Sequence, residues 1–160
     1  PTFSATRPAM LPECYPCAVT LQGDDAPPRE RVHVEAGWRV ALAFNSTLPG
    51  WLVLVPLRHV SALDELTAAE AEEFGLLARR ASSALREVTG CEKTYLMLFA
   101  EAEGFGHLHV HVVPRMADFV PEVLGPRVFA YLTDDADRWM PETERDALAF
   151  DLRSAMARSR

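Results

Sequence analysis

The stretch His107-Leu108-His109-Val110-His111-Val112-Val113-Pro114 decides the fold, and it holds three of the chain's five histidines. Polar and apolar residues alternate strictly from His107 to Val112, and successive side chains of a β-strand point to opposite faces. The alternation predicts a strand with three imidazoles on one face and an apolar face turned toward the core. Imidazoles titrate near neutral pH, act as nucleophiles or proton donors, and bind metal ions. The row therefore predicts a functional site, and a solvated edge strand is the alternative interpretation.

The composition predicts one globular domain over residues 1–160, because 49% of the residues are hydrophobic and 24% are charged. A net charge of −7 argues against a nucleic-acid duplex as partner but leaves room for a small phosphorylated ligand. No apolar run approaches the ~20 residues that cross a bilayer, so no membrane partner is expected. The proline-containing N-terminus lacks the apolar segment of a signal peptide. Three cysteines, two of them in Cys14-Tyr15-Pro16-Cys17, favour a reducing compartment such as the cytoplasm.

Working outward from the histidines, alternating or apolar runs predict further strands over residues 31–35, 38–44, 51–56 and 94–101. Thr67-Ala68-Ala69-Glu70 has the capping-box pattern that begins a helix, and Gly90 is suited to end it. A last helix is expected to begin near Pro141, with that proline in its first turn. Residues 1–13 are expected to form an irregular arm, and residues 116–160 a C-terminal extension that holds the last helix. These elements predict an α+β fold.

The histidine run resembles the His-φ-His-φ-His-φ-φ signature (φ apolar) of the histidine-triad (HIT) family of nucleotide-binding proteins. A second segment, Pro49-Gly50-Trp51 through Arg58-His59, resembles that family's Pro-Gly-His, apolar strand and Pro-Lys/Arg-x-His. The resemblance covers about residues 14–115. It implies an antiparallel five-stranded sheet with one long helix, and a homodimer.

The resemblance also implies an activity: hydrolysis or transfer of a nucleotidyl group through a covalent nucleotidyl-histidine. It points to His109 as the nucleophile that attacks the α-phosphorus, and to His111 as the residue that reaches a phosphate oxygen or the leaving group. The implied substrates are nucleoside phosphoramidates or dinucleoside polyphosphates. The residues alone also permit another chemistry, in which the histidine pair holds a catalytic zinc ion.

Cys14 and Cys17 have the spacing that grips one zinc ion, but a tetrahedral structural site needs two further ligands. A subset of the HIT family completes such a site with histidines that correspond to His59 and His107 here. The resemblance thus implies one structural zinc ion per chain. A redox-active pair or two buried apolar cysteines are the alternatives.

The substrate-binding residues are less like those of the resembled family. Asn45 follows a predicted strand, where the family places a residue that binds the ribose hydroxyls, although an asparagine also suits a simple turn. The loop before the histidines carries Glu103 where the family has glutamine, and a carboxylate beside a phosphate is unfavourable. Backbone N–H groups of Gly104 and Gly106 could bind the phosphate instead. Trp51 stands where the family has histidine. These departures leave an alternative function, a catalytically weak nucleotide-binding or interaction module stabilised by zinc.

Overall fold

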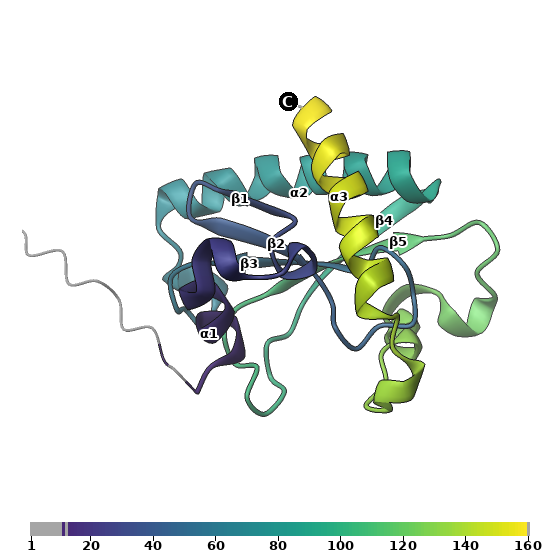
Figure 1. The fold of residues 1–160 in the computed structure, drawn as a ribbon, viewed down its shortest axis with the longest axis horizontal. Helices are drawn as coiled ribbons and strands as arrows, with labels where there is room; N and C mark the ends of the chain where they lie inside the picture. Colours follow the sequence, from purple (N-terminus) through teal and green to yellow (C-terminus); the bar gives the residue numbers. More distant parts are fainter. Residues whose placement is uncertain (1–10, 12, 160) are drawn as a thin grey trace, which may run out of the picture.

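The protein is described by a computed structural model that covers residue 11 and residues 13–159, so the predicted irregular arm lies almost entirely outside the described residues. An antiparallel sheet with the strand order β1-β2-β3-β5-β4 runs through its centre (Figure 1). The strands are β1 (His33–Glu35), β2 (Trp38–Leu42), β3 (Leu52–Pro56), β4 (Lys93–Leu98) and β5 (Val110–Arg115). This confirms the predicted α+β fold and its five-stranded antiparallel sheet. Strands β1, β2 and β3 are shorter than their sequence patterns, and β4 begins one residue and ends three residues earlier than predicted.

The long helix α2 (Ala68–Thr89) begins and ends where the sequence predicts. The Thr67 hydroxyl accepts a hydrogen bond from the Glu70 backbone N–H at 3.2 Å, and the Glu70 carboxylate accepts one from the Thr67 backbone N–H at 2.8 Å. This reciprocal pair is the capping box, which satisfies two N–H groups that the first helical turn leaves free. Gly90 follows the last turn in the left-handed conformation, with φ of 72°.

Helix α2 and the C-terminal helix α3 (Glu142–Arg158) pack on the same face of the sheet, and the main core lies between them and the strands (Figure 1). The core uses alternate residues of the strands and one stripe of each helix. Its members include Val40, Leu42, Leu54, Val110, Val112, Leu77, Ala81, Leu85, Leu152 and Met156. The prediction that Pro141 lies in the first turn of α3 is wrong by one residue. Its ψ of 144° is extended, so helical geometry begins at Glu142 and the proline caps the helix.

The C-terminal extension before α3 folds over part of the other face of the sheet. It forms three short 3₁₀ helices: Pro121–Val123, Gly125–Tyr131 and Ala136–Arg138. Three backbone hydrogen bonds tie it to the loop after β2: from the Thr47 N–H to the Tyr131 carbonyl at 2.9 Å, from the Thr133 N–H to the Asn45 carbonyl at 3.0 Å, and from the Met140 N–H to the Ser46 carbonyl at 3.2 Å. A second apolar cluster, built on Leu48, Trp51, Val113 and Val128, fills the space beneath it.

The turn before β3 requires glycine at position 50. Gly50 has φ of 86°, and a Cβ placed there would lie 3.0 Å from both the Leu85 Cδ2 atom and the Thr89 Cγ2 atom of α2. The missing side chain lets the backbone approach α2 closely. The turn therefore delivers the next residue, Trp51, into the interior, where it is 1% exposed.

The histidine stretch differs from its prediction in one respect. Strand β5 begins at Val110, so His107 and His109 precede it. The predicted alternation still holds for the later residues: Val110 and Val112 face the main core, and His109 and His111 face the opposite side of the sheet. The prediction of three imidazoles on one strand face is therefore wrong for His107, whose ring makes the separate contacts described below.

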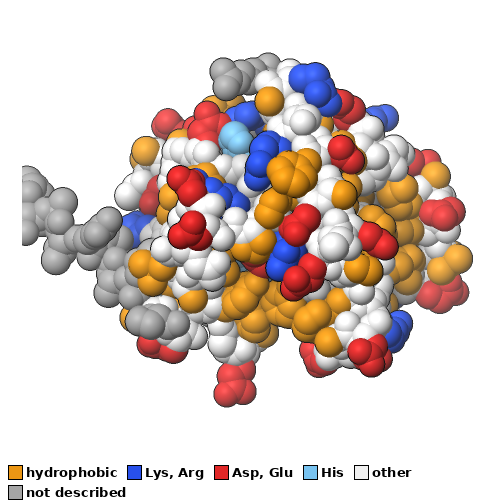
Figure 2. Space-filling view, in the orientation of Figure 1, with side chains coloured by type: hydrophobic (Ala, Val, Ile, Leu, Met, Phe, Trp, Pro, Cys, Tyr) orange, Lys and Arg blue, Asp and Glu red, His pale blue; other side chains and the backbone are white. Residues whose placement is uncertain are grey.

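Helix α1 (Tyr15–Gln22) was not predicted from the sequence, because it lacks an apolar stripe. Cys14 precedes its first turn and Cys17 lies within it. The helix lies beside the sheet, below the β1–β2 hairpin in the view of Figure 1. Hydrophobic side chains gather near the middle of the surface shown in Figure 2, with Asp and Glu side chains among and around them. Among the helices of the described residues, none is both long enough and apolar enough to cross a bilayer.

Candidate active site and Cys2His2 cluster

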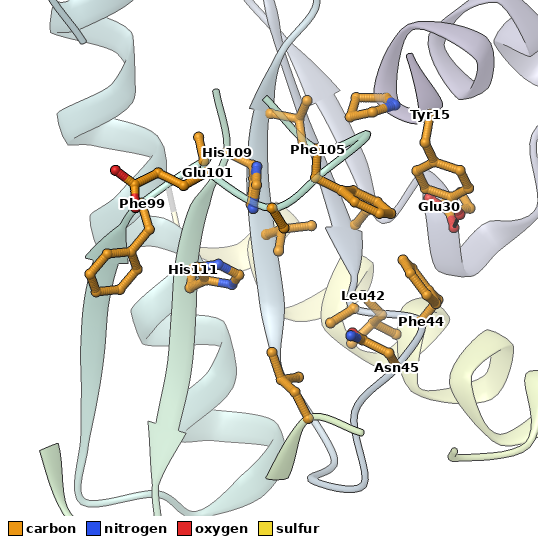
Figure 3. A pocket seen from close by; sticks show the side chains of 18 of the residues that line it. Tyr15, Glu30, Leu42, Phe44, Asn45, Phe99, Glu101, Phe105, His109 and His111 are labelled. Carbon is orange, nitrogen blue, oxygen red and sulfur yellow. Dashed lines mark hydrogen bonds between the residues drawn. The ribbon is translucent and has the colours of Figure 1, made fainter. Parts of the chain in front are cut away.

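A cavity of about 490 Å³ lies on the sheet face that α2 and α3 leave free. Its size suits a nucleotide-sized ligand. Its floor consists of alternate strand residues: Arg39, Ala41, Val53, Val55 and His111. Figure 3 shows His109 and His111 on one side of the cavity, with Tyr15 and Glu30 on the other. The strand period thus places the histidines of β5 in the same concave surface as the outer-face residues of β2 and β3.

His109 is half-buried at the edge of the cavity, and its Nδ1 atom lies 2.8 Å from the main-chain carbonyl oxygen of His107. A carbonyl oxygen only accepts hydrogen bonds, so Nδ1 carries the proton and donates the hydrogen bond. In the neutral ring the other nitrogen, Nε2, then has a free lone pair. This is the state in which an imidazole attacks an electrophile.

His111 is 8% exposed, and its Nδ1 atom accepts a hydrogen bond from the indole N–H of Trp51 at 3.0 Å. The two rings are perpendicular, with an interplanar angle of 89°. Burial, and to a lesser extent the nearby His109, lowers the pKa of His111 to about 4. The ring is therefore neutral at neutral pH. His109 and His111 stand side by side, with ring centroids 4.9 Å apart.

Cys14, Cys17, His59 and His107 converge at the N-terminal end of α1, as the resemblance implied. Their ligand atoms all lie within 4.8 Å of one another. The His107 Nδ1 atom is 3.5 Å from both sulfur atoms, and the His59 Nδ1 atom is 3.3 Å from the Cys17 sulfur. Two thiols and two imidazoles in this arrangement match the donor set of a closed tetrahedral zinc site. The third cysteine, Cys91, is buried in the main core.

The protonation of His107 also fits a metal ligand. Its Nε2 atom lies 2.8 Å from the carbonyl oxygen of Pro56, so Nε2 donates and Nδ1 offers its lone pair to the cluster. Burial lowers the pKa of His107 to about 4, which keeps that lone pair free at neutral pH. The same residue accepts the His109 hydrogen bond through its main-chain carbonyl. His107 therefore joins the Cys2His2 cluster to the residue that faces the cavity.

The far end of the cavity holds a buried polar group that sequence analysis missed. Arg39 is 3% exposed, and its guanidinium donates to the Glu30 carbonyl at 2.7 Å and to the Glu30 carboxylate at 3.3 Å. The Tyr15 hydroxyl donates to the same carboxylate, and burial together with that carboxylate raises the pKa of Tyr15. Tyr15 lies between Cys14 and Cys17, and this was the one feature of the sequence that pointed to the buried polar group. The contacts themselves join three distant parts of the chain.

Of the predicted substrate-binding residues, Asn45 and Glu103 line the cavity (Figure 3 labels Asn45). Gly104 and Gly106 are not among its lining residues in the described part of the chain. Other lining side chains were not singled out from the sequence: Phe99, Glu101, Phe105, Phe129, Leu132 and Asp134. The last three come from the C-terminal extension, for which the sequence carried no recognisable pattern.

Known proteins resemble this chain in sequence and in fold. The family model described as "HIT domain" matches residues 28–118, more than half of the chain. Curated proteins named "AP-4-A phosphorylase", from two strains of Mycobacterium tuberculosis, are 34% identical over 97 residues. The match covers 56% of this chain and 50% of each relative, so the chain spans about half the length of the curated relatives it matches.

Solved structures share the fold at low sequence identity. A zinc-bound histidine triad family protein from Mycobacterium smegmatis has a TM-score of 0.62 at 20% identity, covering 91% of this chain and 94% of that one. A histidine triad protein from Sinorhizobium meliloti 1021 has a TM-score of 0.64 at 24% identity, covering 77% and 86%. The diadenosine triphosphate hydrolase of Plasmodium falciparum has a TM-score of 0.63 at 14% identity, covering 81% and 78%.

Proposed function

This chain belongs to the HIT domain family, and from that premise we propose that it is a nucleotide hydrolase or nucleotidyl transferase that works through His109. One observation carries the proposal: His109 faces a nucleotide-sized cavity with Nδ1 held by a carbonyl and the Nε2 lone pair free. In the proposed reaction, Nε2 attacks the α-phosphorus and forms a covalent nucleotidyl-histidine. Water or another acceptor then takes the nucleotidyl group.

The proposed substrates are nucleotides in which the α-phosphate carries a good leaving group, either dinucleoside polyphosphates or nucleoside phosphoramidates. The relatives named AP-4-A phosphorylase and diadenosine triphosphate hydrolase support the first class.

The cavity walls support one functional domain over the whole chain, since Tyr15 and Phe129 lie outside the matched residues 28–118 and yet line the cavity.

The test is a panel of diadenosine tetraphosphate, diadenosine triphosphate and adenosine 5′-phosphoramidate, each incubated with the protein in the presence and absence of inorganic phosphate. With diadenosine tetraphosphate, release of AMP and ATP identifies water as the acceptor, and phosphate-dependent release of ADP and ATP identifies a phosphorylase. With diadenosine triphosphate the leaving group is itself ADP, so there the acceptor is identified by whether AMP is released. Both outcomes support transfer of the nucleotidyl group from its leaving group to an acceptor. Binding without turnover of any compound would instead support the alternative function, a catalytically weak nucleotide-binding or interaction module, which the carboxylates of Glu101 and Glu103 at the cavity favour.

We further propose that the Cys2His2 cluster binds one structural zinc ion per chain through Cys14, Cys17, His59 and His107. The converging donor atoms and the zinc-bound structural relative support this assignment. Such a closed shell leaves no open position for water, so the zinc would stabilise the fold rather than take part in the reaction.

Three cysteines that form no disulfide support a reducing compartment such as the cytoplasm.

A homodimer is proposed through the edge of the sheet. Strand β4 is an edge strand of the described sheet, and an unpaired edge offers free backbone N–H and C=O groups to a second chain. Leu96 on β4 and Phe99 just after it are 47% and 53% exposed, which supports a covered surface there. Light scattering should give twice the mass of one chain, and a monomer at micromolar concentration would contradict the proposal.

Exchanging Glu103 for glutamine is expected to raise kcat/KM for diadenosine tetraphosphate by about tenfold. Glu103 lines the same cavity as His109 and His111, and its negative charge repels an anionic substrate. The amide removes that charge and adds a donor for a phosphate oxygen. Steady-state kinetics measures the effect, which should shrink in high salt because ions screen the charge term.

The matched control is Glu72→Gln, which makes the same charge change on an exposed position of α2 away from the cavity. It should leave kcat/KM unchanged. If Glu103→Gln lowers activity on a substrate with a cationic group, the loop is built to bind that group. If neither variant changes any rate, Glu103 does not face the substrate.

A further inference from the structure

The hydrogen bond between Trp51 and His111 fixes where the proton of His111 resides. An indole N–H can only donate, so the His111 Nδ1 atom, 3.0 Å away, must present a lone pair. The proton of the neutral ring is then on Nε2, the nitrogen that remains available to the cavity. Within the described part of the chain, Nε2 of His111 makes no hydrogen bond, so it is free to donate to a ligand.

The surrounding packing holds this arrangement in place. Trp51 is 1% exposed and enters the interior directly after Gly50, whose backbone lies against α2. Phe129 from the C-terminal extension packs edge-on against both rings, with centroid distances of 5.4 Å to Trp51 and 5.3 Å to His111. Rotation of the His111 ring would break its hydrogen bond with Trp51 and disturb its packing against the rings of Trp51 and Phe129. The ring therefore has one stable orientation.

The same contact opposes a positive charge on His111. Protonation at Nδ1 would set two N–H groups against each other in a buried site, and it would leave the indole N–H without an acceptor. Burial acts in the same direction by lowering the pKa of the ring to about 4. His109 is the other titratable side chain packed directly against His111, and the remaining ring neighbours, Trp51 and Phe129, are uncharged at neutral pH.

We propose that Trp51 is a positioning residue that holds His111 as a neutral Nε2–H donor, and that the site consequently selects substrates whose leaving group departs as an anion. On this proposal, phosphoanhydrides such as dinucleoside polyphosphates are preferred to phosphoramidates. The inference rests on the proposed function and narrows its substrate class. It concerns a residue at which this chain departs from the resembled motif, where tryptophan replaces histidine.

The chemistry of the two substrate classes explains the preference. The His109 Nε2 lone pair forms a bond to the α-phosphorus while the bond from phosphorus to the leaving group breaks, and the bonding electrons go with the leaving group. A departing polyphosphate spreads the charge over its oxygens and needs no proton. A departing amine must gain a proton, and His111 could supply it only by becoming an imidazolate anion. His111 therefore stabilises negative charge by hydrogen bonding without transferring a proton.

The tautomer is tested without substrate, by long-range ¹⁵N–¹H correlation spectra of the histidine rings, with His111→Asn used to assign the His111 signals. In the unmodified protein at neutral pH, His111 should carry its proton on Nε2 alone. Trp51→Phe keeps an aromatic ring but removes the donor, and it should give a mixture of both tautomers. Trp139→Phe is the control, because it removes another indole donor, to the Thr133 carbonyl, outside the cavity. It should leave the His111 signals unchanged.

The selectivity is tested by the ratio of kcat/KM for diadenosine tetraphosphate to that for adenosine 5′-phosphoramidate. We expect a ratio above about ten in the unmodified protein, and a ratio at least about tenfold lower in Trp51→His, whose imidazole permits a charged His111. A proton on Nδ1 or a cationic His111 in the unmodified protein would overturn the proposal, even if neither Trp51 variant folds. Preference for the phosphoramidate would overturn the selectivity. If His111 carries its proton on Nε2 but the protein turns over neither compound, the proposed function is overturned and the tautomer assignment stands.

Discussion

Replacing His109 with alanine is expected to reduce turnover at least about 1,000-fold, a loss of about 4 kcal/mol of transition-state stabilisation. The variant loses the nucleophile, which is the lone pair on Nε2. That lone pair is free because the proton is on Nδ1, where it is held by the His107 carbonyl. The fold should survive, because the His109 ring lies at the cavity while the neighbouring Leu108 and Val110 provide the buried contacts. Nucleotide binding should therefore persist while chemistry is lost.

Steady-state rates on the most active compound of the panel measure this loss, and circular dichroism checks the fold. Acid-sensitive adducts should also be trapped: mass spectrometry of a quenched wild-type reaction should find one nucleotidyl group on the peptide that contains His109. His33→Ala is the control, since His33 lies on β1, pairs with Glu35, and does not line the cavity. A His109→Ala variant with near wild-type rates would rule out the covalent mechanism.

Loss of the Cys2His2 cluster is expected to lower the melting temperature by at least about 10 °C. Structural zinc sites contribute about 10 kcal/mol or more of apparent binding free energy in small zinc-dependent folds, and each kcal/mol shifts the melting temperature of a chain this size by about 2–4 °C. The double variant Cys14→Ala/Cys17→Ala removes two of the four proposed ligands. Metal that binds only the folded state stabilises it, so a strong chelator should have a similar effect on the unmodified protein.

Metal analysis of protein purified without chelator should find about one equivalent of zinc, and none in the double variant. Cys91→Ala is the matched control, because Cys91 is equally buried but packs in the main core. It should keep the zinc and lose only the small contribution of one core side chain. Protein that contains no zinc, or in which Cys14 and Cys17 form a disulfide, would refute the assignment.

The sequence predicted those parts of the fold that local patterns encode. Alternation around Val110 and Val112 predicted a strand with one face in the core, and Thr67, Glu70 and Gly90 marked the ends of α2. Each of these signals arises from neighbours a few residues apart, where side-chain direction and backbone hydrogen bonding are determined locally.

The remaining parts of the site depend on contacts between distant residues. The pairing of Glu30 with Arg39 and Tyr15 is one example, and the packing of Phe129 against His111 is another. Nothing in the neighbouring sequence specifies such partners. The cluster of two cysteines and two histidines is also non-local, and it was anticipated only because the chain resembles a family with that donor set. The position of His107 outside β5 follows from this cluster, since its ring turns toward the two sulfur atoms.

The C-terminal extension supplies Phe129, Leu132 and Asp134 to the cavity, while the sheet supplies the two histidines. The reacting groups and this wall are therefore encoded in separate stretches of the gene. Insertions or substitutions in the extension can reshape the binding surface without altering any strand of the sheet. In an evolutionary lineage, the wall formed by Leu132 and Asp134 can change while His109 and His111 stay constant, whereas a change at Phe129 also removes a ring that packs against His111.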